Sequence, residues 1–228
     1  IAHNFRHDDS DLTIGFPKPQ VPDSRYHYGT QADILNDYLT RLHARMIEAA
    51  AVPRRAVNLG DYKNWFNPDS PGVQHLGVPY ITFKYPHDTP SIWVREIQKG
   101  YEMAAVFEHS SPHVNAFALD QPENSTGSFH SYWAGGDRDR VFLRLPIEDG
   151  PSTSLFFNSF GCSNMQYDEQ NCLGQMYAIL HGGLTSLGAT TSNWGFNSHE
   201  PFCRELADGR TFGEAFRRYV NTLNWDYG

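Results

Sequence analysis

Residues 155–164 read LFFNSFGCSN, an apolar run that ends in a glycine, a cysteine and two polar residues. A second apolar run, MAAVF at residues 103–107, is followed closely by His109. Short apolar runs of this kind are typical of strands that are buried on both faces of a parallel sheet. Open α/β sheets bind ligands at the carboxyl ends of their strands. If the two strands are neighbours, Cys162 and His109 are therefore expected at the same edge of one sheet.

The rest of the chain alternates between helix-like and strand-like segments. Apolar residues at helical spacing predict helices at residues 31–51, 91–100, 172–181 and 211–223. Further strand-like runs lie at residues 56–60, 78–84 and 184–190. Strands that alternate with helices predict an α/β fold of three layers, in which helices cover both faces of a mostly parallel central sheet.

Other segments do not fit this alternation. Residues 1–30 are rich in Pro, Asp and His and show no period, which predicts an irregular N-terminal arm before a domain at residues 31–228. Residues 113–140 are long and polar, as expected of a surface insertion or an active-site loop. Cys203 is expected in a polar loop, and Thr211 is expected to cap the last helix.

The composition is that of a globular domain, with 39% hydrophobic and 19% charged residues among 228. A formal net charge of −8 argues against nucleic-acid binding, which needs a basic surface. No apolar run approaches the ~18 residues of a transmembrane helix, so no membrane span is expected. The first residue is Ile rather than Met, which indicates a piece of a longer precursor with other domains. The sequon at Asn124 favours a location outside the cell, at its surface or in a periplasm.

Cys162 and His109 have the chemistry of a cysteine nucleophile and its base. A thiolate attacks a carbonyl carbon, and a neighbouring imidazole takes the thiol proton and later protonates the leaving amine. Cys162 follows His109 by 53 residues, close to the order and spacing of caspases and the reverse of papain-like enzymes. Gly161 is expected to allow a tight backbone turn, and N–H groups beside Cys162 are expected to hold the oxyanion.

The segments after Cys162 form a longer pattern. It reads NCLGQ at residues 171–175, HGG at 181–183, LGAT at 187–190, then Trp194, and it closes with TFGEAF at 211–216. Upstream, His109 is followed by two serines. In this order the pattern resembles gingipain-type cysteine peptidases, which belong to the same broad group as caspases and legumains. The resemblance covers residues 90–223 and implies a caspase/gingipain-like α/β sandwich.

The resemblance also implies an activity, a cysteine endopeptidase that forms a thioester acyl-enzyme on a polypeptide substrate. Cys162 is the implied nucleophile and His109 the implied acid and base, with N–H groups at Ser110 and beside Cys162 as oxyanion donors. Trp194 and Ser163 are implied to contact the substrate. The family has Gly where this chain has Ser110, a change that keeps the amide donor. The chemistry requires no cofactor.

Several alternatives remain open at this point. A catalytically inactive relative could serve as a binding or structural module of a larger, secreted protein, and Ser110 in place of Gly favours that reading. Asp137 and Asp139 are candidates for a structural calcium ion or for selecting a basic side chain, although a solvated turn has the same pattern. The histidines number eleven, but they show no metal-ligand spacing. Cys162 taken alone is more typical of a buried, inert thiol than of a nucleophile.

Overall fold

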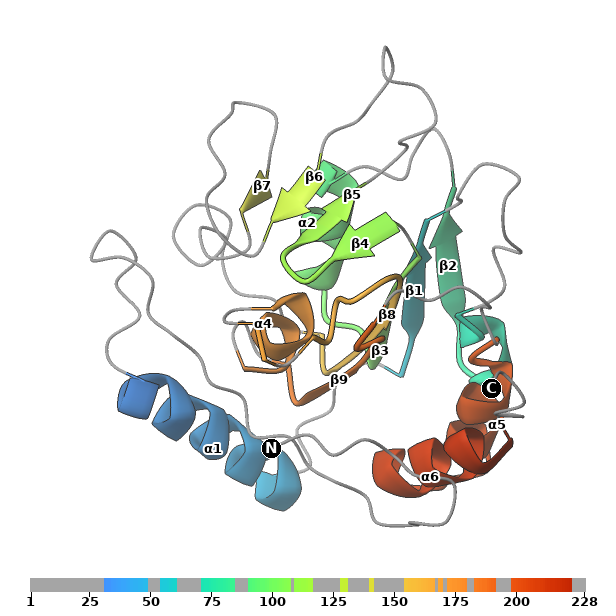
Figure 1. Ribbon diagram of the computed structural model, residues 1–228. Coiled ribbons are helices and arrows are strands. Elements are labelled where there is room, and N and C mark those ends of the chain that lie inside the picture. The colour runs from blue at the N-terminus through green and yellow to red at the C-terminus, as the bar shows by residue number, and fades with distance from the viewer. Residues whose placement is uncertain are drawn as a thin grey trace.

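The computed structural model has the alternating helices and strands expected from the sequence, together with several shorter elements (Figure 1). It describes residues 31–48, 54–60, 71–84, 90–107, 109–116, 128–130, 140–141, 154–166, 168–169, 172–179, 183–191 and 198–222. The helices are α1 (Gln31–Glu48), the 3₁₀ helix η1 (Val73–His75), α2 (Pro90–Ile97), α4 (Leu173–Ile179), α5 (Glu200–Ala207) and α6 (Phe212–Thr222). The N-terminal arm predicted at residues 1–30 lies outside the described residues.

The described strands form two sheets. Their bounds are β1 (Ala56–Leu59), β2 (Tyr80–Phe83), β3 (Met103–Phe107), β4 (His109–Ser111), β5 (Val114–Ala116), β6 (Ser128–His130), β7 (Arg140–Val141), β8 (Phe156–Phe160) and β9 (Thr185–Leu187). The larger sheet has the order β2-β1-β3-β8-β9, and every neighbouring pair in it is parallel. The chain moves outward from β1 to β2 and then returns past β1 to β3, so the strand order reverses between β1 and β3. The predicted parallel sheet is confirmed.

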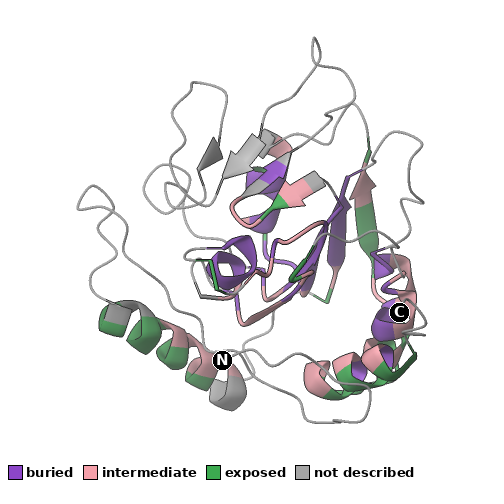
Figure 2. Ribbon diagram, in the orientation of Figure 1, coloured by how far each residue is buried: buried purple, intermediate pink, exposed green. Residues whose placement is uncertain are grey.

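Helices cover both faces of the parallel sheet, which makes three layers (Figure 2). One face packs against α2 and α4, with Tyr38 of α1 at its margin. The other face packs against η1, α5 and α6. Alternate residues of β3 serve the two layers, since Ala104 and Val106 face the first while Met103 and Ala105 face the second. The continuous apolar run is therefore explained by burial on both sides.

Large side chains hold the layers together. Trp93 of α2 and Tyr177 of α4 are fully buried, and both contact the ring of Phe157 on β8. On the other face, Phe202 of α5 is fully buried within the second core cluster. Burial of one such side chain contributes about 1.5–3 kcal/mol. These contacts fix β8, the strand that leads to Cys162, between the two helical layers.

The smaller sheet corrects one expectation. Residues 113–140, expected to be a surface insertion or loop, contain β5, β6 and the start of β7, which pair in the order β4-β5-β6-β7. These strands are two or three residues long. Strands this short show no alternation of apolar and polar residues, so the sequence pattern could not indicate them.

The second correction concerns Cys203, which was expected in a polar loop. It lies on α5 and is fully buried. Pro201 in this segment favours a loop in a sequence reading, but proline is tolerated in the first turn of a helix, and it occupies that turn here. The predicted cap of α6 is confirmed, because the N–H of Glu214 donates to Thr211 Oγ1 at 3.3 Å.

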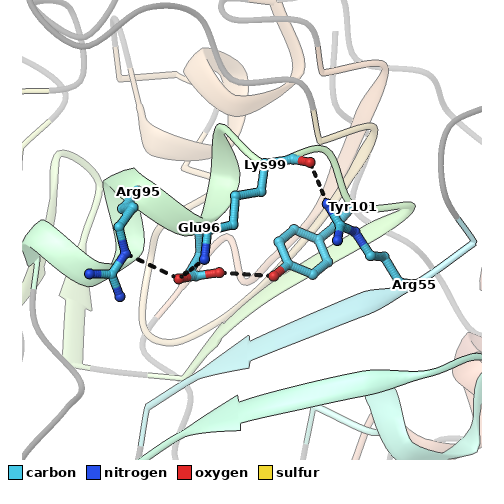
Figure 3. Close-up of polar contacts among 5 residues, drawn as sticks. All are labelled: Arg55, Arg95, Glu96, Lys99 and Tyr101. Atoms are coloured by element: carbon cyan, nitrogen blue, oxygen red, sulfur yellow. Dashed lines mark hydrogen bonds and ion pairs between the residues drawn. The ribbon is translucent and has the colours of Figure 1, made fainter.

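A charged cluster lies at the amino ends of β1 and β3 (Figure 3). The side chain of Glu96, at the end of α2, is 1% exposed and accepts hydrogen bonds from Lys99 Nζ at 2.7 Å and from the hydroxyl of Tyr101 at 2.8 Å. Arg95 Nε lies 3.3 Å from the same carboxylate, and Arg55 lies over the Tyr101 ring. Burial alone would raise the pKa of Glu96, but the hydrogen bonds from Lys99, Tyr101 and Arg95, together with the positive charge of Lys99, outweigh it and lower that pKa.

Candidate active site

The segments that carry the two predicted catalytic residues leave the parallel sheet at the same edge. β3 and β8 are neighbours, and their last residues, Phe107 and Phe160, are paired in register. β4 begins at His109 just beyond the carboxyl end of β3, and Cys162 lies two residues beyond the end of β8. The expectation that the two strands are neighbours is therefore confirmed. The side chain of His109 lies outside the described residues.

A hydrogen bond joins the two segments directly. Ser110 Oγ donates to the carbonyl oxygen of Cys162 at 2.6 Å. Both residues are half-buried, so this contact lies at the border between the sheet edge and solvent. The hydroxyl that distinguishes Ser110 from the glycine of the resembled family thus binds the backbone of the predicted nucleophile.

The hairpin of β4 and β5 is anchored to the helices behind it. The carbonyl oxygen of Pro112, in the hairpin turn, accepts a hydrogen bond from the N–H of Leu173 at 2.7 Å, at the start of α4. Asn115 Nδ2 donates to the hydroxyl of Tyr177 at 3.0 Å, and Trp93 Nε1 donates to the same hydroxyl at 2.9 Å. All three of these side chains are buried. The strand that begins at His109 is therefore fixed to the helix that follows Cys162.

The register of the hairpin determines the direction of the Ser110 amide. Ser111 pairs with Val114 across a two-residue turn, and Ser110 pairs with Asn115. In antiparallel strands, hydrogen-bonded and non-hydrogen-bonded pairs alternate, and the pair that closes a two-residue turn is hydrogen-bonded. Ser110 therefore occupies a non-hydrogen-bonded position, and its N–H points away from β5.

The backbone after β8 bends continuously through residues 161–163, beginning at Gly161 as expected. Ser163 has φ 53°, a left-handed conformation that is uncommon for residues other than glycine. Its N–H donates to the carbonyl oxygen of Thr191 at 3.0 Å. The expectation of a turn at Gly161 is therefore confirmed, and the bend continues through Ser163. The amide of Ser163, a predicted substrate contact, is engaged within the protein.

Asn164 is the centre of the hydrogen bonds in this loop, a role that the sequence reading missed. Its side chain is fully buried. Asn164 Nδ2 lies 3.0 Å from the carbonyl oxygen of Ser159, 3.1 Å from that of Gly161 and 3.3 Å from Ser110 Oγ. Its Oδ1 accepts a hydrogen bond from the N–H of Ala189 at 3.0 Å. The one available signal was the residue type, because Asn readily binds nearby backbone groups in turns.

Two glycines of the resembled pattern leave room for this loop. A Cβ on Gly188 would lie 2.1 Å from Asn164 Oδ1, and a Cβ on Gly174 would lie 1.6 Å from the sulfur of Met165. The N–H of Gly174 also donates to the carbonyl oxygen of Asn164 at 2.8 Å. The Cys162 loop therefore packs so closely against Gly174 and Gly188 that a larger residue at either position would clash with it.

The three cysteines, all within the described part of the chain, differ in environment. Cys162 is half-buried, whereas Cys172 and Cys203 are fully buried thiols outside any disulfide. Burial raises the pKa of Cys172 to about 11 and that of Cys203 to about 12. A thiol with a pKa this high is almost entirely protonated at neutral pH and is a poor nucleophile. Exposure therefore favours Cys162 as the reactive thiol.

The remaining predicted residues lie outside the described part of the chain. Trp194, Asp137 and Asp139 belong to this group, so the substrate-pocket and calcium readings stay predictions. Among the described residues, no cluster of three or more His, Cys, Asp or Glu side chains has the arrangement of a metal site. Within the same residues, no helix has the length and apolar character needed to cross a membrane.

Comparison with known proteins supports the fold. The structure is similar to the crystal structure of the Arg-specific cysteine proteinase gingipain R, with a TM-score of 0.57 and 12% sequence identity. The match covers 88% of this chain and 50% of that chain, so this chain spans about half the length of the proteinase structure. No family model and no curated protein matches the sequence. At this identity the likeness shows the fold alone, and the fold is the predicted caspase/gingipain-like α/β sandwich.

Proposed function

We propose that this chain is the catalytic domain of a cysteine endopeptidase, with Cys162 as nucleophile and His109 as acid and base. The observation that carries the proposal is the meeting of two strand ends. The segment after β3 contacts the segment after β8 through the 2.6 Å hydrogen bond from Ser110 Oγ to the Cys162 carbonyl. This contact lies at the carboxyl edge of the sheet, where open α/β folds bind their ligands, and the fold is shared with a cysteine proteinase.

The proposed reaction follows the chemistry of acyl transfer. The His109 imidazole takes the thiol proton, and the Cys162 thiolate attacks the carbonyl carbon of a peptide bond. The carbonyl oxygen becomes an oxyanion held by the N–H groups of Cys162 and Ser110. When the C–N bond breaks, His109 protonates the leaving amine and a thioester to Cys162 remains. Water, deprotonated by His109, then hydrolyses the thioester and restores the thiol.

The direction of the Ser110 amide supports the second oxyanion donor. Because Ser110 is at a non-hydrogen-bonded position of the hairpin, its N–H is not used by β5. A serine can therefore supply the same backbone donor as the glycine that the resembled family has at this position. The proposal includes a polypeptide substrate, contact of Trp194 and Ser163 with that substrate, and export from the cell as part of a longer precursor.

Hydrolysis of a mixed peptide library, followed by mass spectrometry, tests the proposal. Wild-type protein is expected to cleave peptides, while Cys162→Ala and His109→Ala lose at least about 10³-fold in kcat, as nucleophile and base variants of triad peptidases do. Cys203→Ala is the matched control, because it removes a thiol that is buried in α5, away from the site, and it should retain activity. Cleavage that persists in Cys162→Ala, or that is absent from the wild type, would refute the function.

A further inference from the structure

The loop between β8 and α4 contains two consecutive peptide planes whose carbonyl groups are both held by side chains. The carbonyl oxygen of Gly161 lies 3.1 Å from Asn164 Nδ2. The carbonyl oxygen of Cys162 accepts the hydrogen bond from Ser110 Oγ at 2.6 Å. A trans peptide is planar, and its C=O and N–H point in opposite directions. The side chains that hold these carbonyls therefore also determine the directions of the N–H groups of Cys162 and Ser163.

The second of these planes is held at both ends within the protein. Ser110 binds its carbonyl oxygen, and its N–H, which belongs to Ser163, donates to the carbonyl oxygen of Thr191 at 3.0 Å. This N–H is therefore directed into the protein. The oxyanion donor beside the nucleophile must then come from the first plane, which contains the N–H of Cys162.

The orientation of the first peptide plane depends on Asn164. The amide of Asn164 is fixed on both sides, because Nδ2 binds the carbonyl oxygens of Ser159 and Gly161 while the N–H of Ala189 binds Oδ1 at 3.0 Å. The side chain is fully buried beneath the loop. The Gly161 carbonyl therefore points into the protein, and the Cys162 N–H points the opposite way, toward the outer side of the loop.

We infer that Asn164 is a positioning residue, which orients the Cys162 N–H toward the oxyanion formed from the substrate carbonyl. The inference rests on the proposed function and assigns a role within it to a side chain that does not itself touch the substrate. Removal of one oxyanion donor typically lowers kcat by about 10²–10³-fold. Because loss of Asn164 misdirects this donor but leaves it in place, the expected loss in kcat is at least about 10-fold.

Two substitutions separate orientation from packing. Asn164→Ala removes the whole amide, whereas Asn164→Asp keeps the size of the side chain and the acceptor for the Ala189 N–H but removes the donor to Gly161. Both are expected to lower kcat at least about 10-fold, with KM changed by no more than about 3-fold. Asn158→Ala is the matched control, since Asn158 is equally buried and donates to the carbonyl oxygen of Pro71 at 2.9 Å on the other side of β8.

Two inhibitors make the test specific for the oxyanion. A peptide aldehyde adds to the Cys162 sulfur to give a hemithioacetal, whose oxygen occupies the oxyanion position. Iodoacetamide alkylates the same sulfur by displacement of iodide, and no oxyanion forms. The Asn164 variants should bind the aldehyde at least about 10-fold more weakly, while the rate of alkylation by iodoacetamide should stay within about 3-fold of the wild type.

The possible results distinguish the inference from the proposed function. If the wild type shows Cys162-dependent hydrolysis and a folded Asn164 variant keeps its kcat and aldehyde affinity, the positioning role is refuted and the function stands. If alkylation falls in parallel with kcat, the loop has collapsed and the specific role is also refuted. If the wild type shows no Cys162-dependent hydrolysis, both fail together. Should Asn164→Ala not fold, Asn164→Asp gives the same readouts, and the fold of each variant is checked by its melting curve beside that of Asn158→Ala.

Discussion

The two edges of the parallel sheet are held together by different kinds of interaction. At the carboxyl edge, neutral groups bind backbone carbonyls, as Asn164 and Ser110 do around Cys162. At the amino edge, the buried carboxylate of Glu96 is paired with Lys99 and Tyr101 (Figure 3). Neutral hydrogen bonds to fixed carbonyls set the direction of the peptide groups beside the nucleophile. The ion pairs stabilise the opposite edge, where no candidate catalytic residue lies.

Because backbone groups lie close together at the carboxyl edge, we expect the stability of the protein to fall when a side chain is added there. Gly60, at the end of β1, has φ 129°, and a Cβ there would lie 2.0 Å from the carbonyl oxygen of Phe107. Because that oxygen belongs to the backbone of β3, the clash cannot be relieved by a side-chain rotation. Gly60→Ala is expected to lower the free energy of unfolding by at least about 3 kcal/mol, measured by urea titration.

Gly209 provides the control for this substitution. It also has a positive φ, 82°, but a Cβ there would meet no atom within 4 Å. Gly209→Ala is expected to cost only about 1 kcal/mol, from its backbone conformation alone. If both variants lost the same free energy of unfolding, close packing at the end of β1 would not be a source of stability at the carboxyl edge.

At the amino edge, the expected effect is smaller and depends on pH. Glu96→Gln removes a charged acceptor from Lys99 and Tyr101 and should cost about 2 kcal/mol at neutral pH. The pKa of Glu96 is lowered in the folded protein from an ordinary value of 4.5. Its contribution is therefore complete above about pH 4.5 and is lost as the pH falls through the folded-state pKa. Urea titrations of both proteins between pH 7 and pH 3 measure the difference.

Comparison of the two proteins at each pH isolates Glu96. His199 is also buried, and burial lowers its pKa to about 3, so it too destabilises the protein in acid. That effect is common to the wild type and Glu96→Gln and cancels in the difference. A difference that stays constant down to pH 3 would mean that the Glu96 carboxylate does not stabilise this edge through its charge.

The sequence predicted those parts of the fold that depend on local pattern. The runs at 103–107 and 155–164 identified β3 and β8, because burial on both faces produces an apolar run that needs no partner to be recognised. The short strands β5 to β7 have no such signal, since their pairing depends on residues elsewhere in the chain. The helix α5 was missed because Pro201 is as typical of a loop as of a first helical turn.

The candidate site also has features that the sequence pattern predicts and features that it does not. The meeting of the Cys162 and His109 segments at one edge follows from strand ends that sequence pattern can locate. The role of Asn164 does not, because it depends on Ala189, which lies 25 residues away along the chain and two residues beyond the end of β9. Nor could the bond from Ser110 to Cys162, 52 residues apart, be read from either segment alone. Both contacts join segments that become neighbours only in the folded sheet, so a local sequence pattern could not predict them.

Detection of the acyl-enzyme tests the central claim most directly. The wild type would be mixed with a cleavable peptide ester, quenched in acid within milliseconds to seconds, and digested for mass spectrometry. The account predicts a thioester adduct on the fragment that contains Cys162, with the fragments of Cys172 and Cys203 unmodified, because both of these thiols are buried. Turnover of the substrate with no adduct on Cys162, or with an adduct on another residue, would contradict it.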